Sequence, residues 1–142
     1  MATLSVLKRC LAMLMLFCGV AALADDSLDA AVKRLSTVET FAFGGVGYLG
    51  VPSKGEIDFK VVLSKPQPVA LAAFENLYAM GNPQGKSYAL SGLKKLNSNR
   101  FKELLASAEG STDEVEVMRG CIMSHELLRD VAEQIDRGKF RF

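Results

Sequence analysis

The residues best suited to chemistry in this sequence are Cys121 and His125, which lie four positions apart. On a helix this spacing puts two side chains on one face, where they could act as thiolate and base or as two metal ligands. Gly120 and Ser124, however, indicate that a strand ends and a helix begins between them. We therefore expect Cys121 to be a buried structural cysteine beside a histidine near a helix cap. A reactive Cys121–His125 pair and an intermolecular disulfide are the alternatives.

A glycine-rich segment, residues 44–52, contains the spacing Gly-x-Gly-x-x-Gly that is typical of dinucleotide-binding loops. That chemistry requires a strand before the glycines and a helix directly after them. Here a helical pattern precedes the glycines instead of a strand, and Pro52 comes two residues after the last of them. We expect a structural turn, with Tyr48 and Leu49 as candidate binding residues if the turn is exposed.

Other catalytic motifs are missing. The sequence holds no Gly-x-Ser-x-Gly elbow, no His-Glu-x-x-His pair and no complete phosphate-binding loop of the form Gly-x4-Gly-Lys-Ser/Thr. Close carboxylates such as Glu56 and Asp58, or Glu114 and Glu116, are better explained as solvated faces of amphipathic segments. We expect no metal and no cofactor, and a binding function rather than catalysis.

Charge is ordered along the second half of the chain. Five bases without an acid between them are followed by five acids without a base. The bases are Lys86, Lys94, Lys95, Arg100 and Lys102, and the acids are Glu103, Glu109, Asp113, Glu114 and Glu116. A polarised surface could orient a partner, which makes Lys94, Lys95, Arg100 and Lys102 candidate binding residues. We favour the simpler explanation that the two segments pack together.

The elements that position these residues are mostly helical. Apolar periodicity and cap signals predict helices over residues 27–40, 53–64, 69–80, 83–96 and 101–108, with a last helix that Ser124 caps and Gly138 ends. Gly81 is expected to end its helix in a left-handed conformation. Residues 41–52 are expected to be irregular. Alternation predicts a strand near residues 114–122.

The amino terminus has the pattern of a secretory signal peptide. Lys8 and Arg9 precede an uncharged apolar run over residues 10–24, which ends in a small-x-small sequence. The run is shorter than the roughly 20 residues that span a bilayer, so an uncleaved anchor is the less favoured alternative. Cleavage after Ala24 would remove Cys10 and Cys18, leaving Cys121 without an intrachain disulfide partner.

Composition sets the remaining bounds. The chain has 142 residues, 49% of them hydrophobic and 23% charged, with a formal net charge of +1. This composition excludes a disordered tail and a polytopic membrane protein. Loss of Lys8 and Arg9 would leave a chain close to neutral, so we expect no nucleic-acid partner. Because cleavage also removes the apolar run over residues 10–24, we expect no stable membrane insertion afterwards.

These observations predict a signal peptide over residues 1–24 and one mainly α domain over residues 25–142. We expect a compact bundle of five or six short helices with at most one short strand. The favoured function is non-enzymatic protein binding in the periplasm or outside the cell, by an immunity or inhibitor protein or an envelope adaptor whose partner is another envelope or secreted protein. The alternatives are a small Cys/His-dependent enzyme and a carrier of an apolar ligand, whose cavity Phe41, Phe43, Phe59 and Phe74 would line.

Overall fold

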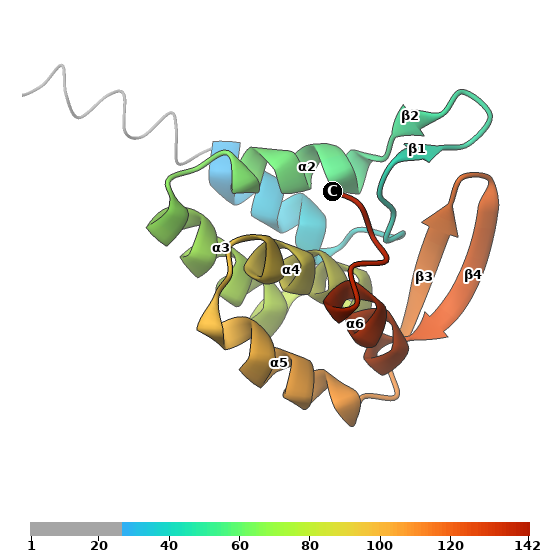
Figure 1. The fold of residues 1–142 in the computed structure, drawn as a ribbon. Helices are drawn as coiled ribbons and strands as arrows, with labels where there is room; N and C mark the ends of the chain where they lie inside the picture. Colours follow the sequence, from blue (N-terminus) through green and yellow to red (C-terminus); the bar gives the residue numbers. More distant parts are fainter. Residues whose placement is uncertain (1–26) are drawn as a thin grey trace, which may run out of the picture. The chain divides into compact units, whose positions relative to one another are not determined.

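The computed structural model describes residues 27–142 and gives them six helices and two short antiparallel hairpins (Figure 1). The first helix covers residues 27–36, and residues 31–142 form one compact unit. The mainly α prediction is therefore confirmed. The predicted signal peptide lies outside the described residues. Within them, no helix has both the length and the apolar character that crossing a bilayer requires.

Side-chain caps fix where several helices begin. The first is α2 (Lys54–Leu63), whose predicted N-cap at Ser53 is confirmed because Ser53 Oγ accepts a 3.0 Å hydrogen bond from the Glu56 N–H, while the Glu56 carboxylate accepts from Gly44 and Lys60 instead of from Ser53. Next comes α3 (Gln67–Met80), which follows Pro66 directly. Then α4 (Pro83–Lys95) begins at a proline, and Asn82 caps it by accepting from the Gly85 N–H at 2.8 Å.

Two further helices complete the set. The first, α5 (Asn99–Glu109), starts after a break at Asn97, which has a φ of 52°. The second, α6 (Leu128–Asp136), is followed by Gly138 with a φ of 70°, and thus ends as predicted.

The central element is α4, which packs against α2, α3, α5, α6 and the second hairpin. A Cβ atom added at Gly92 would lie 2.4 Å from the Phe74 ring, so this glycine lets α3 and α4 approach closely. The largest fully buried side chains are Tyr88, Phe41, Phe59, Phe74, Leu35, Leu77, Leu90, Leu93, Leu128, Ile135, Val62 and Val115.

Strand content exceeds the prediction of one strand. The first hairpin pairs β1 (Gly45–Val46) with β2 (Val51–Pro52), in the segment predicted to be irregular. The second pairs β3 (Glu114–Arg119) with β4 (Ile122–Leu127) around the turn residues Gly120 and Cys121. The predicted strand at 114–122 is thus only the first arm of a hairpin.

Four local predictions were wrong. Glu56 and Asp58 do not lie on a solvated face, because both are buried in α2, with exposed fractions of 5% and 7%. Ser124 does not cap the last helix, because it lies inside β4 and α6 begins only at Leu128, without a side-chain cap. Gly81 ends α3 in an extended conformation, with a φ of −78° and a ψ of 157°, instead of a left-handed one. Cys121 is exposed rather than buried, because it occupies the turn of a projecting hairpin.

Candidate binding surface at the hairpin tips

The turn of the first hairpin presents large apolar side chains to solvent. Tyr48 is 99% exposed, Leu49 80% and Val51 52%. Gly47 and Gly50 have φ values of 67° and 59°, a left-handed conformation that favours glycine and lets the chain reverse tightly between the two strands. The turn is thus exposed, which is the condition under which Tyr48 and Leu49 are candidate binding residues.

The second hairpin carries a matching apolar tip. Ile122 is 73% exposed and Met123 52%, next to the turn at Gly120. The Gly47 N–H donates a 3.0 Å hydrogen bond to the Gly120 carbonyl oxygen and so joins the two turns. The two tips therefore lie next to each other, and we call their exposed apolar residues the tip surface; its members are Tyr48, Leu49, Val51, Ile122 and Met123.

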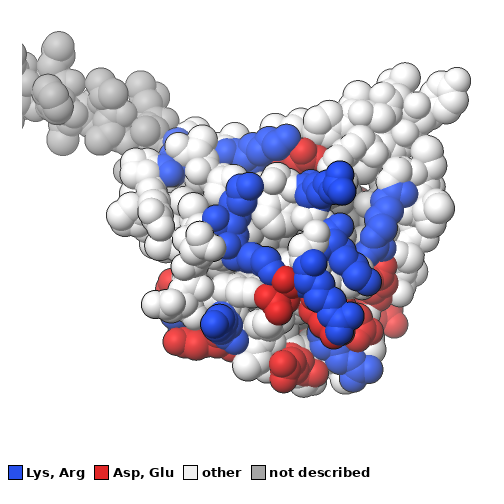
Figure 2. Space-filling view, viewed as in Figure 1, with Lys and Arg blue, Asp and Glu red and all other residues white. Residues whose placement is uncertain are grey.

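The tip surface is free of charge. No Asp, Glu, Lys or Arg occurs between residues 41 and 53 or between residues 120 and 125. In Figure 2 the tip of the first hairpin is white, whereas Lys, Arg, Asp and Glu gather over the helices and a basic side chain lies along the second hairpin. An apolar, uncharged projection of this kind is typical of a site that another molecule covers.

A buried polar network holds the base of the first hairpin. The Tyr88 hydroxyl accepts a hydrogen bond from the Ala42 N–H at 3.0 Å and donates one to the Ala42 carbonyl at 2.9 Å. Ser53 Oγ also donates to that carbonyl, at 3.0 Å. Burial raises the pKa of Tyr88, because a phenolate would be poorly solvated there. The hydroxyl therefore keeps the proton that it donates.

Glu56 holds the first hairpin at a second point, closer to its turn. Its buried carboxylate accepts a 2.8 Å hydrogen bond from the Gly44 N–H and a 2.6 Å hydrogen bond from Lys60 Nζ. Next to it, a Cβ atom at Gly55 would lie 2.4 Å from the Tyr88 hydroxyl oxygen, so α2 can approach Tyr88 only because residue 55 is glycine. The hairpin is thus fixed before any partner binds, which lowers the entropy cost of binding.

A second network braces the other hairpin against α6. Arg119 forms an ion pair with Glu126, and the Glu126 carboxylate also accepts hydrogen bonds from Gln134 at 2.7 Å and from Ser124 at 2.9 Å. Mainly through Arg119, these donors lower the pKa of Glu126 to about 2. The Arg119 guanidinium also lies over the Phe140 ring, 5.1 Å from its centroid.

The structure does not bring Cys121 and His125 together on a helical face. Cys121 lies in the turn, and His125 lies in β4 opposite Glu116. Strand residues advance about 3.3 Å each, so Ile122 and His125 alone are separated by roughly 10 Å of extended chain. Within residues 27–142 no group of three or more His, Cys, Asp and Glu side chains is arranged to hold a metal ion.

The charged candidate residues lie apart from the tip surface. Lys94 and Lys95 belong to the last turn of α4, and Arg100 and Lys102 to the start of α5, on the opposite side of Figure 1 from the hairpins. Two ion pairs, Lys86 with Asp113 at 3.7 Å and Arg100 with Glu103, join the basic segment to the acidic one.

Most of these charges have partners within the chain. Lys94 pairs with Asp136 at 3.1 Å, and Arg100 pairs with Glu103. Lys95 donates to the Phe142 carbonyl at 3.3 Å. Of the four candidates only Lys102, which is exposed, has no such contact within residues 27–142.

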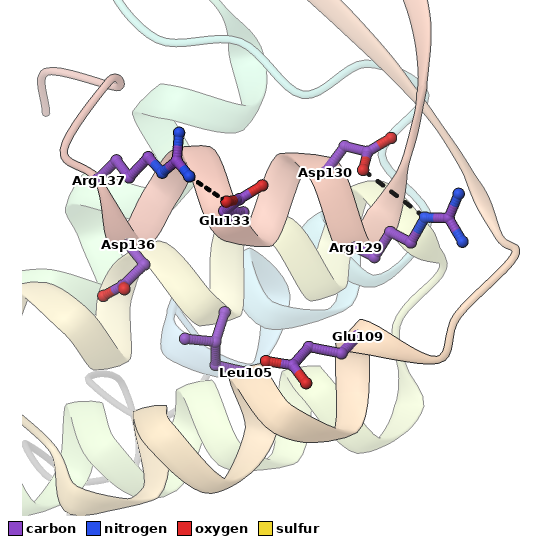
Figure 3. Close-up of a pocket in the computed structure, with 7 residues that line it drawn as sticks. All are labelled: Leu105, Glu109, Arg129, Asp130, Glu133, Asp136 and Arg137. Carbon is purple, nitrogen blue, oxygen red and sulfur yellow. Dashed lines mark hydrogen bonds and ion pairs between the residues drawn. The ribbon is translucent and has the colours of Figure 1, made fainter.

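A polar groove between α5 and α6 was not anticipated from the sequence. Its volume is about 490 Å³, and its lining is Leu105, Glu109, Arg129, Asp130, Glu133, Asp136 and Arg137 (Figure 3). Glu133 pairs with Arg137, and Asp130 with Arg129 at 3.6 Å. The lining thus carries four acids and two bases, and Asp136 pairs with Lys94.

The aromatic side chains proposed to line a cavity pack against one another. Ring centroids lie 5.4 Å apart for Phe41 and Phe43, 5.0 Å for Phe43 and Phe59, and 5.4 Å for Phe59 and Phe74. Phe41, Phe59 and Phe74 are fully buried. These contacts favour a structural role in the core over a ligand cavity.

Comparisons with protein-family models, curated proteins and solved structures gave no match to this chain. Sequence reasoning found Tyr48 and Leu49 but missed Ile122 and Met123. The signal for these two was the uncharged run after Gly120, which a predicted helix start at Ser124 obscured.

Proposed function

We propose that this protein is exported and acts outside the cytosol as a non-enzymatic binding protein. Its partner is another envelope or secreted protein, which the tip surface contacts. An immunity or inhibitor protein and an envelope adaptor both fit this description. The export part of the proposal is based on the signal-peptide pattern of residues 1–24.

The observation that carries the binding role is the exposure of Tyr48 and Leu49 at the tip of the first hairpin, next to the second hairpin with its exposed Ile122. Exposing several large apolar side chains in one place is unfavourable in water, and burying each one in a partner contributes about 1.5–3 kcal/mol. Tyrosine is also enriched among the residues that dominate binding energy at protein interfaces.

Photocrosslinking in the intact cell tests the binding role. The full chain is produced with a benzophenone amino acid in place of Tyr48, and a matched variant carries it in place of Lys102, on the far side of the unit. We expect one discrete polypeptide adduct from position 48 and none from position 102. Leu49→Ser should reduce the adduct at least tenfold, as loss of a central apolar contact predicts.

Two outcomes would overturn the binding role: adducts of equal yield from both positions, or adducts from position 48 with phospholipid alone. The export role is tested separately by sequencing the amino terminus of the mature protein. We expect it to begin at Asp25, and a mature protein that retains Met1 would contradict export by signal cleavage.

A further inference from the structure

The outer edge of the second hairpin is β4, which contributes Ile122 and Met123 to the tip surface and also presents outward backbone groups. On the inner side of β3, the Phe41 N–H donates to the Glu116 carbonyl at 2.8 Å and the Met118 N–H donates to the Phe41 carbonyl at 3.0 Å. Glu116 and Met118 therefore direct their backbone groups away from β4. In an antiparallel ladder, the residue opposite then directs its own groups outward as well.

The register identifies those outward residues. His125 is opposite Glu116, and Met123 is opposite Met118, so the N–H and C=O groups of Met123 and His125 face away from β3. Figure 1 shows β4 as the outermost strand of this hairpin. Within residues 27–142, no other backbone segment pairs with this side of β4.

This edge lacks the usual protection against pairing. Natural edge strands carry proline, lysine or a bulge that blocks the approach of another strand. The β4 sequence Ile-Met-Ser-His-Glu-Leu contains neither proline nor lysine, and its register with β3 is continuous over all six residues. Exposed Ile122 and Met123 add apolar side chains to the two faces of the strand.

We propose that a second copy of this chain pairs with β4, antiparallel and related by a two-fold axis, with His125 opposite His125. The four-stranded sheet would run β3–β4–β4–β3 across the two copies. In this register Met123 lies opposite Leu127 and Ser124 opposite Glu126, so an apolar residue faces an apolar one and no two like charges meet. The outward backbone groups of Met123 and His125 then gain hydrogen-bond partners.

Neighbouring registers are less favourable. Shifting the pairing to put Glu126 opposite Glu126 brings two carboxylates together. Shifting it the other way, so that Ser124 is opposite Ser124, places exposed Ile122 against Glu126. Sequence complementarity therefore selects both the second copy as the occupant and the register centred on His125.

This pairing uses Ile122 and Met123, which also belong to the tip surface, but it leaves the first hairpin outside the dimer contact. Phe41 pairs with β3 on the side away from β4, and the first hairpin continues from Phe41 on that same side. Tyr48 and Leu49 therefore stay accessible in the dimer. Loss of dimerisation and loss of partner binding are expected from different variants, so failure of one proposal leaves the other standing.

Analytical ultracentrifugation of the purified protein tests the dimer. The protein is produced by expressing the full chain and is measured from low micromolar to several hundred micromolar concentration. We expect a concentration-dependent doubling of mass. His125→Pro removes an outward N–H without removing a donor from the β3–β4 ladder, so it should abolish the dimer. His125→Ala keeps the N–H and should preserve it. A monomer at every concentration, or a dimer that survives His125→Pro, would overturn the proposal.

A second measurement covers the case in which His125→Pro fails to fold. Opposite residues of a hydrogen-bonded antiparallel pair have Cα atoms about 5.5 Å apart, a separation that suits a disulfide. In a Cys121→Ser background, His125→Cys should therefore form an intermolecular disulfide at dimer-forming concentrations. Lys139→Cys, at an exposed position, is the matched control. Equal cross-linking of the two variants would refute the register.

Discussion

The Gly47 N–H donates a 3.0 Å hydrogen bond to the carbonyl oxygen of Gly120, and this bond joins the turns of two hairpins that are distant in sequence. Gly120 has a φ of 60°. Glycine adopts this left-handed backbone conformation without strain, and in it the Gly120 carbonyl points toward the neighbouring hairpin. This bond holds the two tips of the tip surface next to each other.

The Tyr88 hydroxyl should be a major source of stability. Tyr88→Phe removes the acceptor of the buried Ala42 N–H and one donor to the Ala42 carbonyl. Leaving a buried N–H without a partner costs about 1–3 kcal/mol. We expect urea unfolding to show a loss of this size. Tyr78→Phe loses a 3.2 Å hydrogen bond to Leu104 and one with Ser107, but at a half-buried site that water can reach, so it should cost less. Equal losses would contradict the anchoring role of Tyr88.

Gly55→Ala should destabilise the protein although alanine is the better helix former. Alanine in a helix gains about 1 kcal/mol over glycine. Here its Cβ would lie 2.4 Å from the buried Tyr88 hydroxyl oxygen, and such overpacking costs about 1–3 kcal/mol. Thermal unfolding should therefore show a lower melting temperature. Gly110→Ala, where a Cβ has no neighbour within 4 Å, is the control and should show no such decrease.

The charge of Glu126 should make stability dependent on acid pH. Its folded-state pKa of about 2 lies below the ordinary value of 4.5, so the ionised form stabilises the folded state. That contribution is complete above about pH 5 and is lost as the pH falls toward 2. Glu126→Gln should therefore reduce the free energy of unfolding at pH 7 by an amount on the order of 1–2 kcal/mol, because Arg119 is partly solvated.

The comparison across pH is the decisive part of that measurement. The difference between the wild type and Glu126→Gln should shrink steadily from pH 5 to pH 2. Glu133→Gln offers a matched control, because Glu133 and its partner Arg137 are both well exposed and a surface pair contributes little. A difference at Glu126 that stayed constant down to pH 2 would show that its charge is not involved.

The Cys121 thiol should react in the native protein. It is exposed in the β3–β4 turn, so a thiol reagent needs no unfolding to reach it. We expect labelling of the reduced protein to be as complete without denaturant as with it. Cys121→Ser should change the free energy of unfolding by less than about 0.5 kcal/mol, as for most surface substitutions. Protection of the thiol in the native protein would contradict its placement.

Helices were the part of the fold that the sequence predicted best. Ser53 with Glu56, and Asn82 with Pro83, are local signals, since a cap and the N–H that it satisfies lie within one turn. The apolar stripe of α6 was likewise visible from spacing alone, and Val131 and Ile135 are buried as it predicted.

The strands could not be predicted in the same way. The two-residue strands β1 and β2 are too short to show alternation, and their hydrogen-bonding partners are set by the turn between them. Near Ser124 the sequence has both a helix-cap signal and a weak strand pattern, and the cap signal led to the wrong prediction of a helix start. The strand forms because β3, with Val115 and Val117 fully buried, provides a ladder along which residues 122–127 can pair.

The sequence by itself determined the caps at Ser53 and Asn82, the apolar stripes and the uncharged glycine-rich segment, because each depends on residues that are neighbours along the chain. Only the tertiary structure decided that Gly47 bonds to Gly120, that Tyr88 holds Ala42, and that His125 lies on an open strand edge. Those facts depend on contacts between distant segments, and which segments meet is decided by the packing of the whole core.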